Sequence, residues 1–178
     1  APSVYTAASF GGACADLTSP TIALGDPGQG PVLTFTTKHD LDYDPSGEIF
    51  GREGSLGQAE IAIGPTFANW TRVPLSPDYP NAIDFPYNAC LTTQSATTYF
   101  TGIRATYTTY TASLSNWAGG DVRVRFHLSG DYLYTGGNWW VDDVSITSAM
   151  VPGACASAAA GPPPIPDGGA VPGTPMRA

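Results

Sequence analysis

The feature that most constrains the fold is the alternation of apolar and polar side chains along short segments. In 121–128, every second residue is apolar (Val122, Val124, Phe126 and Leu128), so these side chains share one face of a strand. Further runs rich in β-branched and aromatic residues lie at 31–38, 58–63, 70–75, 100–110 and 139–146, with weaker ones at 3–7 and 21–24. Strands with one apolar face predict antiparallel sheets that bury those faces against each other. We therefore expect an all-β fold, a two-sheet antiparallel jelly-roll sandwich.

The composition changes after residue 150, which predicts two parts of the chain. Residues 1–150 contain all the expected strands and form the predicted sandwich domain. Residues 151–178 are rich in Pro, Gly and Ala, a composition typical of a linker or an extended polyproline II arm.

Charge and hydropathy exclude several classes of partner. The formal net charge is −8, and an acidic surface repels phosphate backbones, so nucleic acid is not an expected partner. No apolar run is long enough to span a bilayer, so no membrane span is expected. Only 12% of the residues are charged, and Lys38 is the single lysine, a surface composition common in secreted β-proteins.

The three cysteines, Cys14, Cys90 and Cys155, are far apart and form no C-x-x-C pair, which disfavours zinc ribbons and redox dithiols. One disulfide and one unpaired cysteine are expected, and Cys14–Cys90 is the favoured pair. The partner of Cys155 would then lie in another segment or on another molecule.

Two groups of segments together resemble a known class of module. The first runs through 17–24, 32–35, 58–63 and 70–73, and the second joins 121–126 to the Trp-Trp-Val-Asp-Asp-Val strand at 139–144. This order is similar to the MAM-like jelly-roll domains of bacterial secreted multidomain proteins, often appended to exo-metallopeptidases, and the last strand also resembles that of jelly-roll carbohydrate-binding modules. The resemblance implies a jelly roll, often with a structural calcium ion, and no catalytic activity. The longer insertion at 40–56 departs from the family pattern.

Two sets of carboxylates are candidate calcium ligands. Asp142 and Asp143 are neighbours on a strand, so one should face solvent and the other the interior or rim, where calcium or hydrogen bonds would satisfy it. The resemblance implies calcium there, and either Asp could serve. The second set is Asp40, Asp42, Asp44 and Glu48, which begins like an EF-hand but has Pro45 where the turn glycine is needed. A different calcium loop or a solvated acidic loop remain the alternatives.

Aromatic residues form the third candidate site. Tyr132, Tyr134, Trp139 and Trp140 surround a Gly-Gly pair, and Tyr107 and Tyr110 lie on another strand. Exposed rings could stack on sugars, whereas alternate aromatic residues could equally fill the core. By strand alternation, at least one of Trp139 and Trp140 must point away from the core.

The sequence shows no catalytic motif such as H-E-x-x-H, G-x-S-x-G or Walker A, so an enzyme is not expected. His127 should be an exposed surface residue, and His39 has no nucleophile beside it. The chain is therefore predicted to be a non-catalytic, calcium-stabilised module of a larger secreted or cell-surface protein, recognising glycan or protein. The alternative is a self-assembling surface or filament subunit, a homo-oligomer joined through an edge strand or the C-terminal arm.

Overall fold

The computed structural model describes residues 5–7, 14–44, 53–83, 90, 98–130 and 137–150. Fourteen strands and two short 3₁₀ turns lie in these ranges. The strands are β1 (Tyr5–Ala7), β2 (Cys14–Thr18), β3 (Ile22–Leu24), β4 (Val32–Leu41), β5 (Tyr43–Asp44), β6 (Glu53–Gly54), β7 (Leu56–Ile63), β8 (Trp70–Arg72), β9 (Asn81–Ala82), β10 (Thr98–Tyr99), β11 (Ile103–Ser113), β12 (Asp121–Ser129), β13 (Gly137–Ile146) and β14 (Ala149–Met150). The turns are η1 (Pro27–Gln29) and η2 (Ser115–Trp117).

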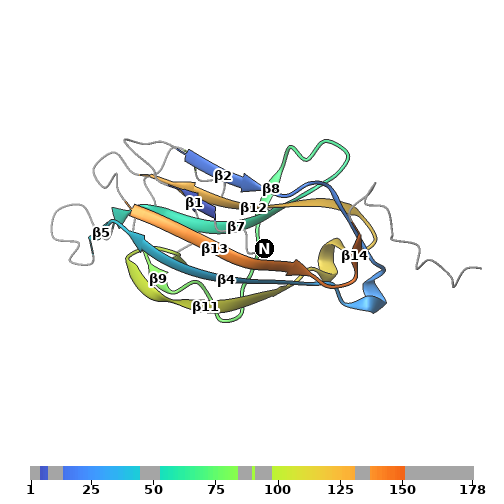
Figure 1. The fold of residues 1–178 in the computed structure, drawn as a ribbon. Helices are drawn as coiled ribbons and strands as arrows, with labels where there is room; N and C mark the ends of the chain where they lie inside the picture. Colours follow the sequence, from blue (N-terminus) through green and yellow to red (C-terminus); the bar gives the residue numbers. More distant parts are fainter. Residues whose placement is uncertain are drawn as a thin grey trace, which may run out of the picture.

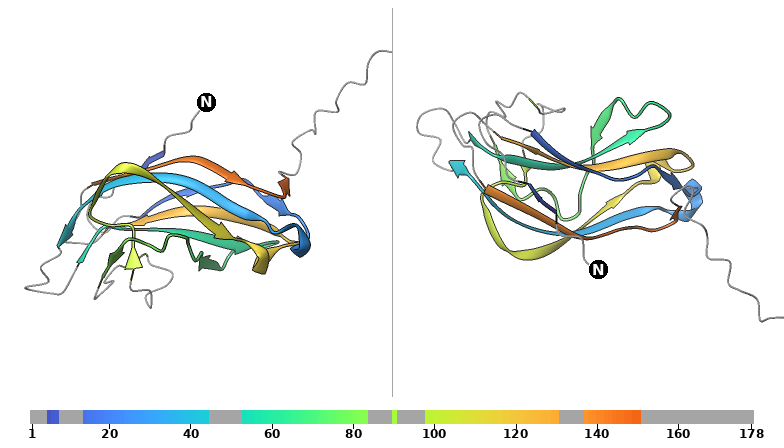
Figure 2. Two further views of the ribbon diagram at one scale, coloured as in Figure 1. Left: turned by 90° about the horizontal axis from the view of Figure 1, so that it is seen from below. Right: turned by 45° about the horizontal axis from the view of Figure 1, so that its top comes forward.

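Two antiparallel sheets are stacked face to face, so the expected all-β sandwich is confirmed (Figures 1 and 2). Sheet A has the strand order β1-β13-β4-β11, and sheet B has the order β14-β3-β12-β7-β8, with β2 also paired to β12. Two small ribbons, β5-β6 and β9-β10, extend the connections after β4 and β8.

The core lies between the sheets and is dominated by aromatic rings. Phe35 of β4 contacts Phe126 of β12 across the sandwich, with ring centroids 4.9 Å apart. Phe100 lies 5.0 Å from Tyr110 and 5.4 Å from Trp139. All five side chains are at most 3% exposed, and burial of rings of this size is a large source of stability.

Strand alternation predicted the apolar faces correctly. Val122, Val124, Phe126 and Leu128 of β12 all lie in the core, as expected. β8 ends at Arg72, two residues before Pro74, and lies at an edge of sheet B, where a residue without a backbone N–H is tolerated. By contrast, β2 was not expected, because its pattern of half-buried and exposed residues carries little apolar signal.

A disulfide joins Cys14 at the start of β2 to Cys90, with Cα atoms 6.1 Å apart, which is the pair that the sequence favoured. Cys155 and the predicted arm, 151–178, lie outside the described residues. The described part of the chain has no helix long and apolar enough to cross a membrane.

Candidate functional site

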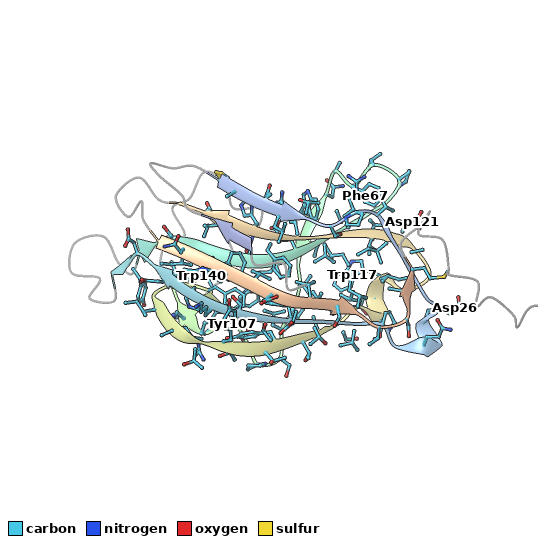
Figure 3. All side chains as sticks on the ribbon, in the orientation of Figure 1. Asp26, Phe67, Tyr107, Trp117, Asp121 and Trp140 are labelled. Carbon is cyan, nitrogen blue, oxygen red and sulfur yellow. A yellow bond between two sulfur atoms is a disulfide. The ribbon has the colours of Figure 1, made fainter. Side chains whose placement is uncertain are left out.

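Two aromatic rings and the single lysine meet on the outer face of sheet A. Lys38 Nζ lies 4.9 Å from the ring centroid of Trp140 and 5.0 Å from that of Tyr107. The three residues come from β13, β4 and β11, which are adjacent in the sheet (Figure 3). We call this group the aromatic face. The ammonium between two rings makes two cation–π contacts, which hold both rings in place.

Strand alternation divides the two neighbouring tryptophans between core and surface, as expected. Trp139 is fully buried, whereas Trp140 is half-buried on the outer face. Thr37 accepts a hydrogen bond from the indole Nε1 of Trp139 at 2.7 Å and donates one to the carbonyl of Trp140 at 2.8 Å. The buried indole N–H is therefore satisfied, and the backbone that carries Trp140 is fixed.

Polar side chains surround the aromatic face. Thr34 and Thr36 of β4 and Asp142 of β13 are half-buried on the same side of sheet A, and Asp40 is exposed there. A bulge between Arg104 and Thr108 interrupts the pairing of β11 with β4. The chain at this bulge, including Tyr107, which is 40% exposed, consequently projects toward solvent. Rings with nearby hydroxyls and carboxylates can stack on a ligand and hydrogen-bond to it at the same time.

Neither Asp142 nor Asp143 lies in the interior, which was one of the two positions, interior or rim, expected for one member of the pair. Asp142 is half-buried and Asp143 is exposed, because a bulge at this point breaks the alternation of β13. Asp143 has φ of 50°, a left-handed conformation that Asp tolerates better than most residues. Its backbone N–H donates to Asp142 Oδ1 at 2.8 Å, and Thr36 donates weakly to its carboxylate at 3.4 Å. Hydrogen bonds therefore partner both carboxylates, which is one of the two alternatives that the sequence left open for this pair.

The acidic insertion is only partly described. Asp40 and Asp42 are exposed at the end of β4, and Asp44 lies in β5. Glu48, Tyr132 and Tyr134 lie outside the described residues. Within the described ranges, no three His, Cys, Asp or Glu side chains are grouped so that they could hold a metal ion.

His127 is buried rather than exposed, so the sequence-based prediction was wrong. It does face away from the core, but the Asp16 side chain and the backbone of Cys90 contact it there, and only 3% of the residue is exposed. Its Nδ1 lies 2.6 Å from Asp16 Oδ1, and its Nε2 lies 2.8 Å from the carbonyl oxygen of Cys90. With both ring nitrogens held in this way, the imidazole has no free position for a substrate.

The same face of sheet B contains a buried ion pair that the sequence did not reveal. Glu60 of β7 is fully buried and accepts hydrogen bonds from Arg125 Nε and from Gln58 Nε2. Arg125 also contacts Asp16 at 3.2 Å, and its guanidinium stacks 4.3 Å from the ring centroid of Trp70. Glu60 and Arg125 are direct cross-strand partners, a relationship that becomes visible only when the strand register is known.

His39 is also enclosed. It is 1% exposed, and its Nε2 lies 3.2 Å from the carbonyl oxygen of Thr101. Burial lowers the pKa of His39 from 6.5 to about 4, an effect that the hydrogen bond to Thr101 partly offsets. Neither histidine in the chain therefore lies at an accessible surface.

The sequence matches no protein-family model, and no curated protein matches it significantly. The function is therefore inferred from the geometry of the chain itself.

Proposed function

We propose that this chain is a non-catalytic binding module of a larger secreted protein, and that it recognises glycan through the aromatic face. The observation that carries this proposal is the alignment of Trp140, Lys38 and Tyr107 across three adjacent strands on the outer side of sheet A.

The chemistry of this face suits a sugar. The C–H side of a pyranose ring is apolar and packs on an aromatic ring, while its hydroxyls need hydrogen-bond partners at the rim. Lys38 offers donors, Asp142 offers acceptors, and the hydroxyls of Thr34 and Thr36 offer both. The rings are braced by the lysine before a ligand arrives, which reduces the entropy cost of binding.

The chain order of the strands supports a jelly-roll assignment. The main strands of sheet A, namely β4, β11 and β13, alternate along the chain with β7, β8 and β12 of sheet B. An arrangement of this kind agrees with the MAM-like and carbohydrate-binding-module resemblance. The Cys14–Cys90 disulfide supports an extracellular location, because disulfides persist in oxidising compartments.

Calcium stays a prediction from the sequence. Its most direct test is thermal melting in calcium and in EDTA. A lower melting midpoint in EDTA would support a structural calcium ion. An unchanged midpoint would contradict the calcium prediction.

Glycan binding is tested with three variants on a glycan array, followed by titration calorimetry with any glycan that binds. Trp140→Ala and Tyr107→Ala should each weaken binding at least tenfold, equivalent to about 1.4 kcal/mol. Phe67→Ala is the matched control, because Phe67 also stacks on a cation, 4.4 Å from Arg123, but lies on sheet B's β7–β8 connection (Figure 3). Equal affinity of the wild type and Trp140→Ala, with both folded, would contradict the proposal.

A further inference from the structure

The outer face of sheet A continues beyond the aromatic face as two rows of short polar side chains. The register of β4 with β11 and β13 defines these rows, because residues paired across antiparallel strands point to the same face. Phe35 and Tyr110, which alternate with the rows along their strands, are buried in the core, so the rows face outward. The rows are Asp142–Thr36–Thr109 and Ser145–Thr34–Thr111, and we call them the hydroxyl track.

The hydroxyl track begins directly beside the aromatic face. Thr36 and Thr34 lie two and four residues before Lys38 in β4, so the track extends roughly 14 Å along the strand from the lysine. Because β4 leads from η1 to β5 (Figure 1), the track lies on the η1 side of the rings of Trp140 and Tyr107 that Figure 3 labels. This length exceeds that of a single pyranose ring. One sugar stacked on the aromatic face would therefore leave the track uncovered.

Several hydroxyls of the track are available to a ligand. Thr109 is exposed and Thr34 is half-buried, and among the described residues neither hydroxyl has a hydrogen-bond partner. Thr36 makes only a weak hydrogen bond to the Asp143 carboxylate, at 3.4 Å, whereas Thr111 donates to the carbonyl oxygen of Ser76 at 3.3 Å. A hydroxyl both donates and accepts, so it can pair with the hydroxyls of successive sugar units.

The charges on this face select a class of glycan. Asp142 is the single charged residue in the hydroxyl track, and the exposed Asp143 follows it in β13. An acidic polysaccharide would meet both carboxylates here and a net charge of −8 on the whole chain, and these charges oppose its binding. A neutral polysaccharide meets no such repulsion, and the carboxylates can accept hydrogen bonds from its hydroxyls.

We propose that the ligand of the aromatic face is a neutral polysaccharide bound along its chain. One sugar unit stacks on the rings of Trp140 and Tyr107, and the following units lie along β4 on the hydroxyl track. Thr34 and Thr109 then determine the preference for a chain over a single sugar. This inference rests on the proposed function and specifies the class of glycan that the same surface recognises.

The dependence of affinity on ligand length tests this inference in the full-length chain. The probes are neutral oligosaccharides of one to six β-1,4-linked units of glucose, mannose, xylose or N-acetylglucosamine, each measured by titration calorimetry. In at least one series, the hexasaccharide should bind at least tenfold more tightly than the disaccharide, because the added units form hydrogen bonds with the track.

Variants separate the hydroxyl track from the aromatic face. The double variant Thr34→Val, Thr109→Val keeps the shape of both side chains and removes their hydroxyls. It should lower the affinity for the hexasaccharide to within about threefold of that for the disaccharide and leave the disaccharide affinity unchanged. Trp140→Ala should weaken the binding of both ligands. Thr18→Val is the matched control, because Thr18 is an exposed threonine on β2 of sheet B, and it should change neither affinity.

The outcomes distinguish this inference from the proposed function. An affinity that does not rise beyond the disaccharide, or a hexasaccharide affinity that the double variant does not lower, would overturn the inference and leave the aromatic face as a site for one sugar. Tighter binding of heparin than of every neutral series would overturn it as well. If no glycan of any length or charge binds, the proposed function and the inference are both wrong.

Discussion

The hydroxyl of Thr37 accepts the indole N–H of Trp139 at 2.7 Å, and both residues are fully buried. This contact lies directly beneath the aromatic face, because Thr37 and Trp139 are the immediate neighbours of Lys38 and Trp140 in their strands. It links the packing of the core to the geometry of the proposed binding surface.

Thr37→Val should therefore destabilise the protein by about 1–3 kcal/mol, since it leaves a buried indole N–H without an acceptor while keeping the shape of the side chain. Urea unfolding measures the change. Thr36→Val is the matched control, because Thr36 lies on the outer face and should change stability by less than about 0.5 kcal/mol. Equal effects of the two variants would contradict this role of Thr37.

Arg125→Met should destabilise the protein by about 3–5 kcal/mol, because it leaves the buried Glu60 carboxylate without its main partner. Chemical denaturation of the single and double variants measures the effect. Adding Glu60→Gln should recover a substantial part of the loss, because the buried charge is then removed. If the double variant is as unstable as Arg125→Met, the loss comes from packing on Trp70 and not from the unpaired charge.

The pKa of His39 should make stability depend on pH in a defined window. Burial lowers the pKa in the folded state to about 4, and the unfolded value is about 6.5. Between these values the unfolded chain binds more protons, so the free energy of unfolding falls as the pH falls from about 6.5 to about 4, by at most about 3 kcal/mol. Urea titrations at several pH values should show a smaller fall in His39→Gln than in the wild type. An identical pH dependence in the two proteins would refute the assignment.

Removal of the Cys14–Cys90 disulfide should cost about 4 kcal/mol, because the bond closes a loop over a sequence separation of 76 residues. The double variant Cys14→Ser, Cys90→Ser is compared with the wild type by thermal melting. Dithiothreitol provides the internal control: it should lower the midpoint of the wild type toward that of the double variant and leave the double variant unchanged. A midpoint in the double variant equal to that of the oxidised wild type would show that the bond contributes little.

The cases in which sequence-based prediction failed share a physical cause. The alternation of residues along a strand predicts which face of the sheet a side chain lies on. It does not predict which other parts of the chain contact that face. His127 points away from the core as predicted, yet Asp16 and the backbone of Cys90 enclose it there. The opposite directions expected for Asp142 and Asp143 required an unbroken strand, and the bulge at Asp143 removed that condition.

The sequence by itself determined the all-β class, the apolar faces of the long strands and the outward direction of one tryptophan at 139–140, because each depends on the period of two along a strand. It favoured the Cys14–Cys90 pair, which only the structure established. The tertiary structure alone decided which strands lie side by side. That pairing brought Lys38 between Trp140 and Tyr107 and placed Arg125 opposite Glu60. Contacts between residues about 100 positions apart depend on strand order and register, which no local pattern in the chain encodes.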